Sequence, residues 1–574
     1  MRPETALPHL ALPWRGVRRV RARRRSWVAA ACAVVVAAGL ALTGCSSQSA
    51  RSSALEHPLT IGMPNGPQSD DSNPFLATSA ATSLGYRFAI YEPLAQVNDT
   101  RPAQKPTPWL AKSWKWNRDY TELTITARNG VKWSDGTAFT ANDIAYSLQL
   151  RKDHPELNTE GLPYGDISVS GDTVSVTFTT GQFANQIKVL QLFIVPEHIW
   201  KKFANPVTDA NKKPVGTGPY VLKDWSPQTV TLTANPHYWG GPLAAPELRY
   251  VSYSGNDTLT TALSVGEAQW GWTFISDFKA VYLDKDKEHN QAFFPAGLAV
   301  DFLALNTQTA PFNDVAVRQA LNMVVDRAKE SKIAESGIFP EVTSVTGIPT
   351  PAGDSFIADE YKGKTYAVDV AGAKKLLTDA GYTYNGKTLI GKNGRPVTFT
   401  LTDPAGWSDY DAGLGLISSA ALSIGIDAKV ETPGADAWTT ALSTGDFQAA
   451  LHWTNISVSP WETYADMFDP NYYAPIGQNA VWNFGRFQND DAKTLFSQYT
   501  NATDDSTRKQ ALDGLQKIFV EQVPALAMDA RPSGAEFSTS YYTGWPSDKN
   551  AYANPQPTMP NVALILTRLK PATD

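Results

Sequence analysis

The sequence predicts a mixed α/β protein whose lobes interleave along the chain. Segments with alternating apolar and polar residues, typical of half-buried strands, concentrate in the first third of the chain. Apolar residues three and four positions apart, typical of helices, dominate from residue 314 onward. No low-complexity linker divides the chain, and no repeat of fixed period is visible. We therefore expect interleaved lobes and not a string of separate domains.

The strand signals are clearest in three places. Residues 123–126 and 230–232 alternate between apolar and polar side chains, as strands with one buried face do. Over residues 167–178, two alternating stretches flank Gly171 and Asp172. Glycine at the first turn position supplies the positive φ that a tight turn needs. The sequence therefore predicts an antiparallel hairpin here.

Three helices are predicted in the second half of the chain. Asp314 and Asp369 are candidate N-caps, Gly381 is placed as a C-terminal stop, and Pro524 follows the third helix. Each helix has its apolar residues on one face: Val317, Ala320, Leu321 and Val324; Ala373, Leu376 and Leu377; and Ala511, Leu512, Leu515, Ile518 and Phe519.

Composition and charge exclude several classes of protein. Of 574 residues, 42% are hydrophobic and 18% charged, which is a globular composition. The two cysteines, Cys32 and Cys45, are too few for a disulfide scaffold or a cysteine-built metal site. The net charge is -6, and the first 44 residues carry eight arginines, so the remainder is more acidic than the whole. An acidic body is a poor partner for nucleic acid or anionic lipid.

The N-terminal segment has the pattern of a secretory signal. An arginine-rich stretch at residues 15–25 precedes an apolar run at residues 27–42, which is shorter than the roughly 20 residues of a membrane-spanning helix. The run ends in LTGC, which resembles a bacterial lipobox, with Cys45 as the nucleophile that accepts the lipid. We expect residues 1–44 to be a lipoprotein signal peptide and residues 45–53 a lipidated, serine-rich tether.

The predicted location follows from this segment. A twin-arginine export signal at Arg24 and Arg25 is a weaker alternative to the general route, and the sequence leaves the choice open. After residue 45 there is no second apolar run of about 18 residues. We expect a body held by lipid on the outer face of the cytoplasmic membrane.

A search for catalytic motifs finds no positive signal. The seven histidines lack metal-ligand spacing, and no nucleophile elbow, phosphate-binding loop or dinucleotide-binding glycine motif is present. A carboxylate pair for glycoside hydrolysis stays open, because acids are plentiful and no two are singled out. We expect no enzyme, no cofactor and no metal.

Several stretches together resemble family 5 of the bacterial extracytoplasmic solute-binding proteins, which includes the oligopeptide- and dipeptide-binding proteins of ABC importers. Residues 129–143 (NGVKWSDGTAFTAND) are similar to the longest signature of that family. Further matching stretches follow one another in the family's order: residues 90–94, 108–114, 195–198, 216–220, 235–239, 305–306 and 311–321. The ordered set covers nearly the whole chain from about residue 59.

The resemblance implies a two-lobe, periplasmic-binding-protein-like fold with an extra α/β domain inserted in the first lobe. A solute binds between the lobes, closure buries it, and an ABC permease in the membrane receives it; we expect a monomer. The implied boundaries are residues 54–97, 215–296 and 538–574 for lobe I, 98–214 for the extra domain, and 297–537 for lobe II.

The class of ligand is predicted from two segments. Peptide binders of this family carry an Asp in lobe II that pairs with the peptide ammonium, because a buried charge needs a counter-charge. The corresponding residues 451–461 have no acid before Glu462, which favours a neutral polar ligand. The tail at residues 542–553 and the segment at residues 404–410 resemble the branch that binds β-linked oligosaccharides of cellobiose or chitobiose type.

Tryptophan and planar polar groups suit such a sugar. Pyranose C–H faces pack on indole rings, and the hydroxyls need donors and acceptors in the ring plane. We expect Trp545, on a Gly-Trp-Pro turn, to lie in an exposed loop. For every tryptophan the alternative is core packing. The candidate ligand-binding residues are Trp407, Asp409, Trp453, Asn455, Trp461 and Trp545, with Trp270, Trp272 and Arg486 as weaker candidates.

Three hypotheses remain at this point. The first is a lipoprotein that captures a β-linked oligosaccharide for an importer. The second has the same fold and binds oligopeptides or dipeptides, with Glu462 as a candidate partner of the ammonium. The third is a secreted, sugar-active enzyme.

Overall fold

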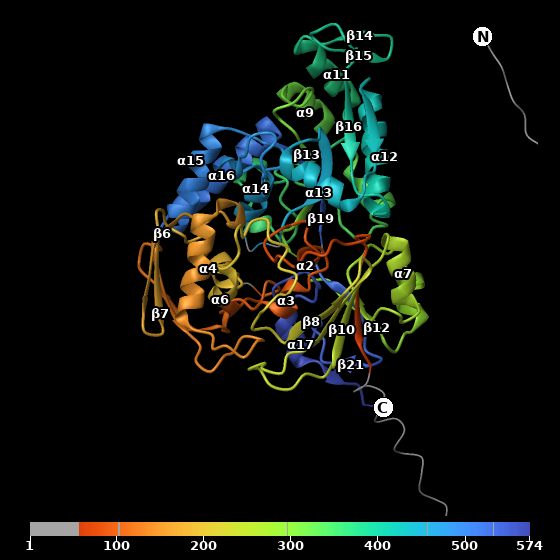
Figure 1. The fold of residues 1–574 in the computed structure, drawn as a ribbon. Helices are drawn as coiled ribbons and strands as arrows, with labels where there is room; N and C mark the ends of the chain where they lie inside the picture. Colours follow the sequence, from red (N-terminus) through yellow and green to blue (C-terminus); the bar gives the residue numbers. More distant parts are fainter. Residues whose placement is uncertain are drawn as a thin grey trace, which may run out of the picture. The chain divides into compact units, whose positions relative to one another are not determined.

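The computed structural model describes residues 57–101, 104–295, 297–455, 457, 459–531 and 533–573 (Figure 1). The predicted signal peptide at residues 1–44, the tether at residues 45–53 and Cys45 lie outside the described residues. Within the described ranges, no helix has the length and apolar character needed to cross a membrane.

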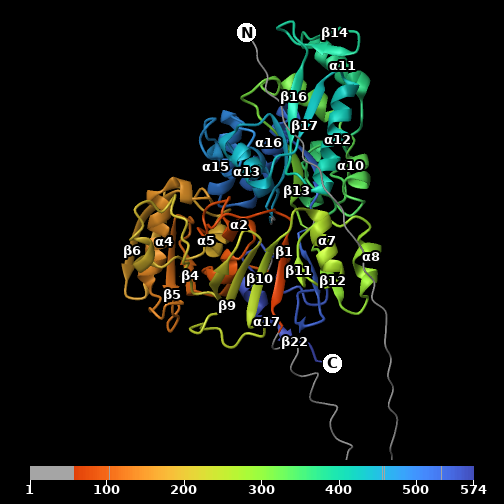
Figure 2. The same ribbon diagram turned by 45° about the vertical axis from the view of Figure 1, so that its right-hand side comes forward.

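A seven-stranded sheet, with the helices on it, forms what we call the first lobe. Strand β1 lies between β10 and β11 and runs parallel to both (Figure 2), and the other pairings are antiparallel. In spatial order the strands are β12 (Asn290–Phe293), β20 (Ala535–Ser538), β11 (Trp270–Gly271), β1 (Leu59–Met63), β10 (Glu247–Ser252), β9 (Thr229–Ala234) and β8 (Tyr220–Trp225). Its helices are α2 (Ala80–Ser83), α3 (Arg87–Ile90), α7 (Asn256–Ser264), α8 (Phe278–Val281) and α17 (Val562–Arg568).

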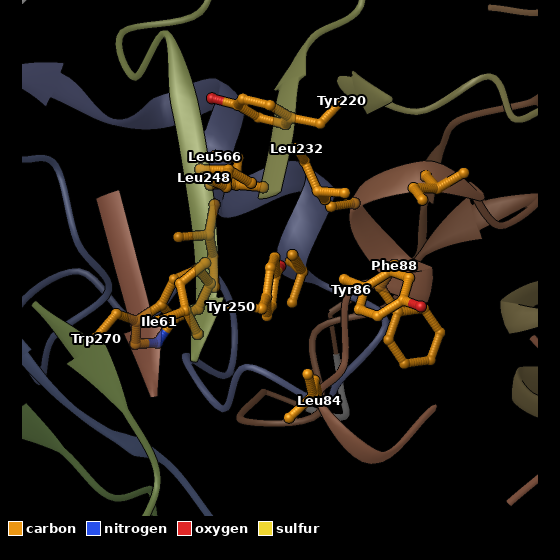
Figure 3. Close-up of a cluster of buried hydrophobic side chains, with 14 of the residues drawn as sticks. Ile61, Leu84, Tyr86, Phe88, Tyr220, Leu232, Leu248, Tyr250, Trp270 and Leu566 are labelled. Atoms are coloured by element: carbon orange, nitrogen blue, oxygen red, sulfur yellow. The ribbon is translucent and has the colours of Figure 1, made fainter. Parts of the chain in front are cut away.

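The core of the first lobe explains its strand pattern. All five residues of β1 are buried, as in a central strand covered on both faces. In β9 the burial alternates, with Val230 and Leu232 fully buried, as the period of two predicted. Ile61, Tyr250 and Trp270 lie together in this core (Figure 3).

A second, four-stranded antiparallel sheet forms what we call the inserted domain. The strands run in the order β4 (Ala111–Trp116), β5 (Glu122–Ala127), β7 (Thr173–Phe178) and β6 (Tyr164–Ser170), with helices α4 (Ala141–Asp153), α5 (Gln186–Gln191) and α6 (Glu197–Trp200). Helix α4 lies against β6 and β7 (Figure 1). The predicted hairpin is confirmed: Val169 pairs with Val174, and Gly171 has a φ of 63°.

A five-stranded sheet forms what we call the second lobe. The strands run in the order β17 (Asp427–Glu431), β16 (Thr398–Thr402), β18 (Ala449–Trp453), β13 (Val300–Leu305) and β19 (Ala525–Ala530). The helices are α9 (Val315–Asn322), α10 (Arg327–Ile333), α11 (Val370–Asp379), α12 (Ser408–Ser423), α13 (Ala435–Thr444), α14 (Pro460–Phe468), α15 (Asp490–Asn501) and α16 (Asp505–Gln522). Short two-stranded pairs complete the described strands: β2 (Ala95–Gln96) with β3 (Thr107–Pro108), β14 (Thr383–Asn385) with β15 (Thr388–Ile390), and β21 (Tyr542–Thr543) with β22 (Lys570–Pro571).

The three predicted helices are confirmed as α9, α11 and α16. Asp314 caps α9 by accepting a hydrogen bond from the Ala316 amide at 3.0 Å. Asp369 caps α11 in the same way, with the Gly372 amide at 2.7 Å. Helix α16 ends at Gln522, before Pro524. Sequence patterns local to each helix therefore set its bounds.

The main sheets of the two lobes are joined by few chain crossings. The chain passes from β12 of the first lobe to β13 of the second, and returns from β19 to β20. The lobes therefore meet where β13 begins and β19 ends. Two sheet-based lobes and an inserted α/β domain confirm the predicted fold class.

Candidate functional site

The centre of the candidate site is Arg531, the residue that follows β19. Its Nη1 donates hydrogen bonds to Oδ1 of Asp301 at 2.6 Å and to the hydroxyl of Tyr410 at 2.9 Å. Its Cζ lies 5.3 Å from the ring centroid of Trp272 and 5.0 Å from that of Trp453. Trp272 belongs to the first lobe and Trp453 ends β18 of the second. The guanidinium therefore contacts one indole from each lobe, a favourable cation–π arrangement.

An aromatic cluster extends from Trp453 into the second lobe. It consists of Trp407, Trp438, His452, Trp453 and Trp482. His452 stacks on Trp453 with ring centroids 4.2 Å apart, and burial lowers the pKa of His452 to about 3, so its ring is neutral. Trp407 and Trp453 are only partly buried. The cluster thus presents flat, uncharged ring surface at the junction of the lobes.

Two of the predicted residues contact the opposite lobe directly. Nε1 of Trp407 donates to the Pro64 carbonyl at 3.0 Å. Oδ1 of Asp409 accepts from Nδ2 of Asn256 at 2.8 Å. Trp407 precedes α12 and Asp409 lies in its first turn, so the start of one helix positions both side chains.

Several carboxyl groups surround Arg531. Burial, with the nearby charge of Asp301, raises the pKa of Asp409 to about 6. Burial and the neighbouring acids raise the pKa of Asp403 and of Glu335 well above the usual range. Of this group Asp301 is the one ion-paired with Arg531. At neutral pH part of the group is protonated, so it can donate as well as accept hydrogen bonds.

Among the described residues, one group has the spacing of a cation site. Glu330, Glu335 and Asp529 each offer a carboxylate oxygen within 4.8 Å of the others, and all three are buried. Burial raises the pKa of Glu330 to about 7 and that of Asp529 well above its usual range. Protonated carboxyls are weak metal ligands, so the trio is better described as a set of buried acids.

A small cavity adjoins Arg531 at the lobe connections. Its lining is Asp99, Thr100, Pro295, Gly297, Ala299, Arg531, Ser533 and Asn554. Burial, and the charge of Glu462, raise the pKa of Asp99 to about 7. The cavity therefore has a cationic side chain and an acid with a raised pKa in its wall.

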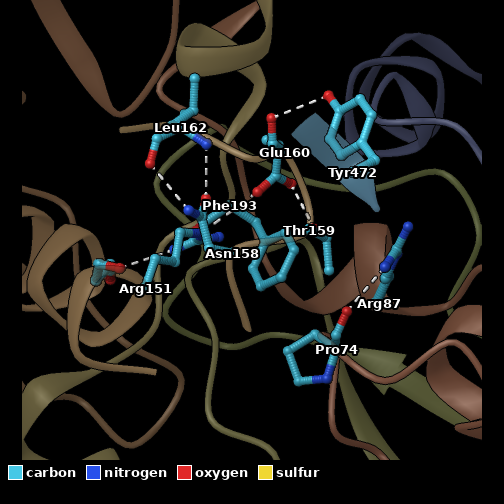
Figure 4. A network of polar contacts seen from close by, with 10 residues as sticks. Pro74, Arg87, Arg151, Asn158, Thr159, Glu160, Leu162, Phe193 and Tyr472 are labelled. Carbon is cyan, nitrogen blue, oxygen red and sulfur yellow. Dashed lines mark hydrogen bonds and ion pairs between the residues drawn. The ribbon is translucent and has the colours of Figure 1, made fainter. Parts of the chain in front are cut away.

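A further polar junction lies between the inserted domain and the second lobe. Nζ of Lys188 and the hydroxyl of Tyr472 are 3.4 Å apart. The same hydroxyl donates to the Glu160 carbonyl at 3.4 Å (Figure 4). Lys188 lies 5.5 Å from the ring centroid of Trp461. Trp461 itself is 3% exposed and stacks on Tyr499, so its ring packs within the second lobe.

The other predicted residues are not gathered at Arg531. Trp270 and Trp545 pack edge to face in the first-lobe core, with ring centroids 5.2 Å apart. The expectation of an exposed loop at Trp545 is wrong: the residue is 6% exposed, because its ring stacks on Phe537 and its Nε1 donates to the Tyr542 carbonyl. Arg486 is fully buried, and its Nη2 donates to the Ser443 carbonyl at 2.6 Å.

Asn455 is exposed in the loop after β18, and its backbone N–H donates a hydrogen bond to Oδ2 of Asp466 at 2.7 Å.

Sequence reasoning missed the centre of the site. Arg531, Asp301 and Asn256 belong to segments that carry no recognised motif, and Tyr410, although it ends the recognised segment 404–410, was not among the predicted site residues. A usable signal was the position of Asp301 within the otherwise apolar strand β13, together with Arg531 directly after β19. A buried charge at such a place needs a partner, and each of these two charges is the partner of the other.

Comparison with known proteins places this geometry in context. The model of the bacterial extracellular solute-binding proteins, family 5, matches residues 105–474. The nickel-binding periplasmic protein of Escherichia coli is 28% identical over 58% of this chain, and the oligopeptide-binding protein OppA of Salmonella typhimurium is 26% identical over 60%. Protein XP55 of Streptomyces lividans is 29% identical over 54%. The matches span 56% to 66% of the length of these three relatives.

Solved structures share the fold. A mannohexaose-bound periplasmic oligopeptide-binding protein of Thermotoga maritima has a TM-score of 0.80 at 21% identity, covering 90% of this chain and 99% of that one. The oligopeptide-binding protein AppA of Bacillus subtilis, in complex with a nonapeptide, has a TM-score of 0.76 at 20% identity with the same coverage. At these identities the likeness is one of fold.

Proposed function

The chain belongs to family 5 of the bacterial extracellular solute-binding proteins, and from this membership we propose that it is the lipid-anchored solute receptor of an ABC importer. The receptor captures a solute between its two lobes and delivers it to the permease. No catalytic step is part of the proposal. The lobe boundaries expected from the sequence, with lobe II at residues 297–537 and the inserted domain at residues 98–214, are part of it.

The proposed ligand is a β-linked oligosaccharide of the cello- or chito-oligosaccharide type. The observation that carries this proposal is the pair of indoles from opposite lobes, Trp272 and Trp453, which both contact Arg531. A pyranose face packs on an indole, while Arg531, Asp301 and Asp409 supply planar hydrogen-bonding groups for hydroxyls. The mannohexaose-bound neighbour of similar fold supports a sugar ligand within this architecture.

Capture follows from differential affinity. A solute that contacts both lobes binds the closed form more tightly than the open form, so it shifts the population toward closure by that difference. Trp272 and Trp453 lie on opposite lobes and Arg531 lies at a lobe connection. A solute in contact with these three side chains therefore bridges the two lobes and stabilises the closed form.

A peptide ligand is the second candidate. The observation that favours it is the acidic wall of the cavity beside Arg531, where Asp99 lies close enough to Glu462 for the charge of Glu462 to raise its pKa. The ammonium group of a peptide would stabilise the charged forms of these two acids, and the carboxylate of the peptide would pair with Arg531. Two similar proteins support this candidate: OppA of Salmonella typhimurium is an oligopeptide-binding protein, and AppA of Bacillus subtilis was solved in complex with a nonapeptide.

Anchoring is proposed from the sequence of the N-terminal segment, with Cys45 as the lipidated residue. The body would then be tethered to the outer face of the cytoplasmic membrane. The unmodified chain should incorporate radiolabelled palmitate, and a Cys45→Ser variant should not; equal labelling of the two chains would contradict the anchor.

A ligand panel tests the function. Thermal unfolding of the chain from residue 46 onward would be followed with cellobiose, cellotriose, chitobiose, xylobiose, mannobiose, and di- to pentapeptides. A ligand at 100 times its dissociation constant stabilises the folded state by about 2.7 kcal/mol, a readable shift in melting temperature. A shift with β-linked sugars alone supports the first proposal. A shift with peptides alone overturns it in favour of the second, and product formation by any sugar would indicate an enzyme.

A further inference from the structure

Residues 404–409 of the second lobe and residues 254–256 of the first lobe form a docking contact made by protein groups alone. The Asn256 amide donates to the Gly406 carbonyl at 2.9 Å, which joins the two backbones. The Asn256 side chain donates to Asp409 at 2.8 Å, and the Trp407 indole donates to the Pro64 carbonyl at 3.0 Å. Three hydrogen bonds therefore connect the start of α12 to the start of α7 and the end of β1.

The side chain of Asn256 is held in place within the first lobe. Asn256 is 3% exposed, and its Oδ1 accepts from Oγ1 of Thr273 at 2.9 Å. This bond assigns the amide orientation, so Nδ2 points toward Asp409. Asn256 thus enters the contact pre-oriented, and little side-chain entropy is lost on docking.

Two glycines make the close approach possible. A Cβ on Gly255 would lie 2.5 Å from the Gly406 carbonyl oxygen, closer than any real Cβ contact. A Cβ on Gly406 would lie 2.9 Å from the Ser254 carbonyl oxygen, and Gly406 has a φ of +89°. Gly255 differs from Gly406 in its own backbone, because its φ of 167° is extended and open to any residue. The need for glycine at position 255 therefore comes from the other lobe.

From this arrangement we infer that residues 254–256 and 404–409 are a built-in closure contact, which positions the second lobe on the first independently of the solute. The inference deepens the proposed function, since it rests on lobes that open and close around a solute. Its consequence is that part of the free energy of closure comes from the protein itself. When more of the receptor is already closed before the solute binds, the apparent affinity for the solute lies closer to the intrinsic affinity of the closed form.

Gly255→Ala tests the contact from the first lobe. The added methyl group collides with the Gly406 carbonyl only when the lobes are docked, and its own backbone accepts alanine. Small-angle X-ray scattering on the chain from residue 46 onward, without added solute, should give a larger radius of gyration than the unmodified chain. The melting temperature should stay close to that of the unmodified chain. If the substitution instead impaired the folding of α7, the melting temperature would fall.

Gly434→Ala is the matched control. Gly434 also precedes a helix, α13, and a Cβ there meets nothing within 4 Å. Its radius of gyration should equal that of the unmodified chain. Equal radii for Gly255→Ala, Gly434→Ala and the unmodified chain would overturn the inference, and so would an equal increase in both variants.

Trp407→Phe tests the same contact from the second lobe. It removes the Nε1 donor to Pro64 and keeps a ring against Trp438. We expect a larger radius of gyration here too, and an unchanged radius in a folded Trp407→Phe variant would contradict the inference even if Gly255→Ala failed to fold. Because the scattering uses no solute, the result stands apart from the ligand panel: an empty panel with a positive scattering result rejects the proposed ligands and keeps the closure contact.

Discussion

At the scale of single residues, the site depends on where charge and aromatic surface meet. Arg531 is nearly enclosed, yet its charge is matched by Asp301 and by the faces of Trp272 and Trp453. An isolated guanidinium at this position would be costly to bury, so the partners and the arginine depend on one another. This mutual dependence makes single substitutions here informative.

Replacing Trp453 tests the aromatic surface. We expect Trp453→Ala to raise the dissociation constant of the solute found in the panel by about tenfold or more, since buried interface tryptophans typically contribute 1–2 kcal/mol or more. Isothermal titration calorimetry measures the change. Trp270→Phe is the control, because Trp270 is fully buried in the first-lobe core and bonded to Pro555. It should lower the melting temperature and leave the affinity unchanged; equal affinities for both variants would remove Trp453 from the site.

Glu536 gives the protein a measurable pH dependence. Burial in β20 raises the pKa of Glu536 from 4.5 to about 8. The folded chain therefore holds a proton that the unfolded chain loses, so the contribution to stability is full below about pH 4.5 and is lost as the pH rises toward 8. We expect Glu536→Gln to flatten the decline of unfolding free energy between pH 5 and pH 8, by on the order of a few kcal/mol. Urea denaturation at several pH values measures it, and an unchanged slope would reject this assignment.

At the scale of elements, local sequence sets where helices and hairpins begin and end. Asp369 at the start of α11 and Gly171 in the β6–β7 turn have their predicted roles, because a cap and a turn depend on neighbours two to four residues away. The start of α12 is different. Trp407 precedes this helix without a side-chain capping bond, and its indole bonds to the other lobe instead. Neighbouring residues determine where Trp407 lies relative to α12, whereas its role depends on a contact with the other lobe.

The cap of α11 offers a direct test of the local rule. Oδ1 of Asp369 accepts from the Gly372 amide at 2.7 Å. Asp369→Ala should lower the free energy of unfolding by about 1 kcal/mol, whereas Asp369→Asn should cost little, because asparagine also caps. Chemical denaturation of the two variants compares them. Equal losses for Ala and Asn would show that the carboxylate charge, and not the capping bond, stabilises the helix.

At the scale of the whole molecule, two separate contacts link parts that are distant in sequence. One is the docking of residues 404–409 on residues 254–256. The other joins the inserted domain to the second lobe through Lys188 and Tyr472. Burial alone would lower the pKa of Lys188, but Tyr472, Glu462 and Asp466 raise it above the usual range, so Lys188 stays charged. Both contacts favour the same arrangement of lobes.

Removing this charge should weaken solute binding through closure. We expect Lys188→Met to raise the dissociation constant of the solute about three- to tenfold by reducing the closed population, and Lys188→Arg to have a smaller effect. Combined with Gly255→Ala, the changes in log Kd should add, because the two contacts share no residue. Calorimetry on the single and double variants tests this. A double variant no weaker than either single one would contradict this additivity and show that the two contacts depend on one another.

The sequence by itself determined the mixed α/β class, the hairpin at residues 167–178, the three helices, two of them with their capping residues, and the resemblance to family 5. These depend on periods of 2 and 3.6 residues and on ordered short motifs, all of which are local. Among the candidate ligand residues, the sequence also marked Trp407, Asp409, Trp453 and Trp272, which the structure places at the junction of the lobes.

Only the tertiary structure decided how those residues are used. Trp545 was a candidate on a par with Trp453, and Trp270 was a weaker one, yet the two pack on each other inside the first lobe. Arg531 lies 230 residues from Asp301 and bonds to it because β19 and β13 are neighbours in one sheet. Sheet order and the chain crossings between lobes bring such side chains together, and no local pattern encodes distances of that length. The physical reason is that burial and charge pairing depend on neighbours in space, and the chain has these neighbours only when it is folded.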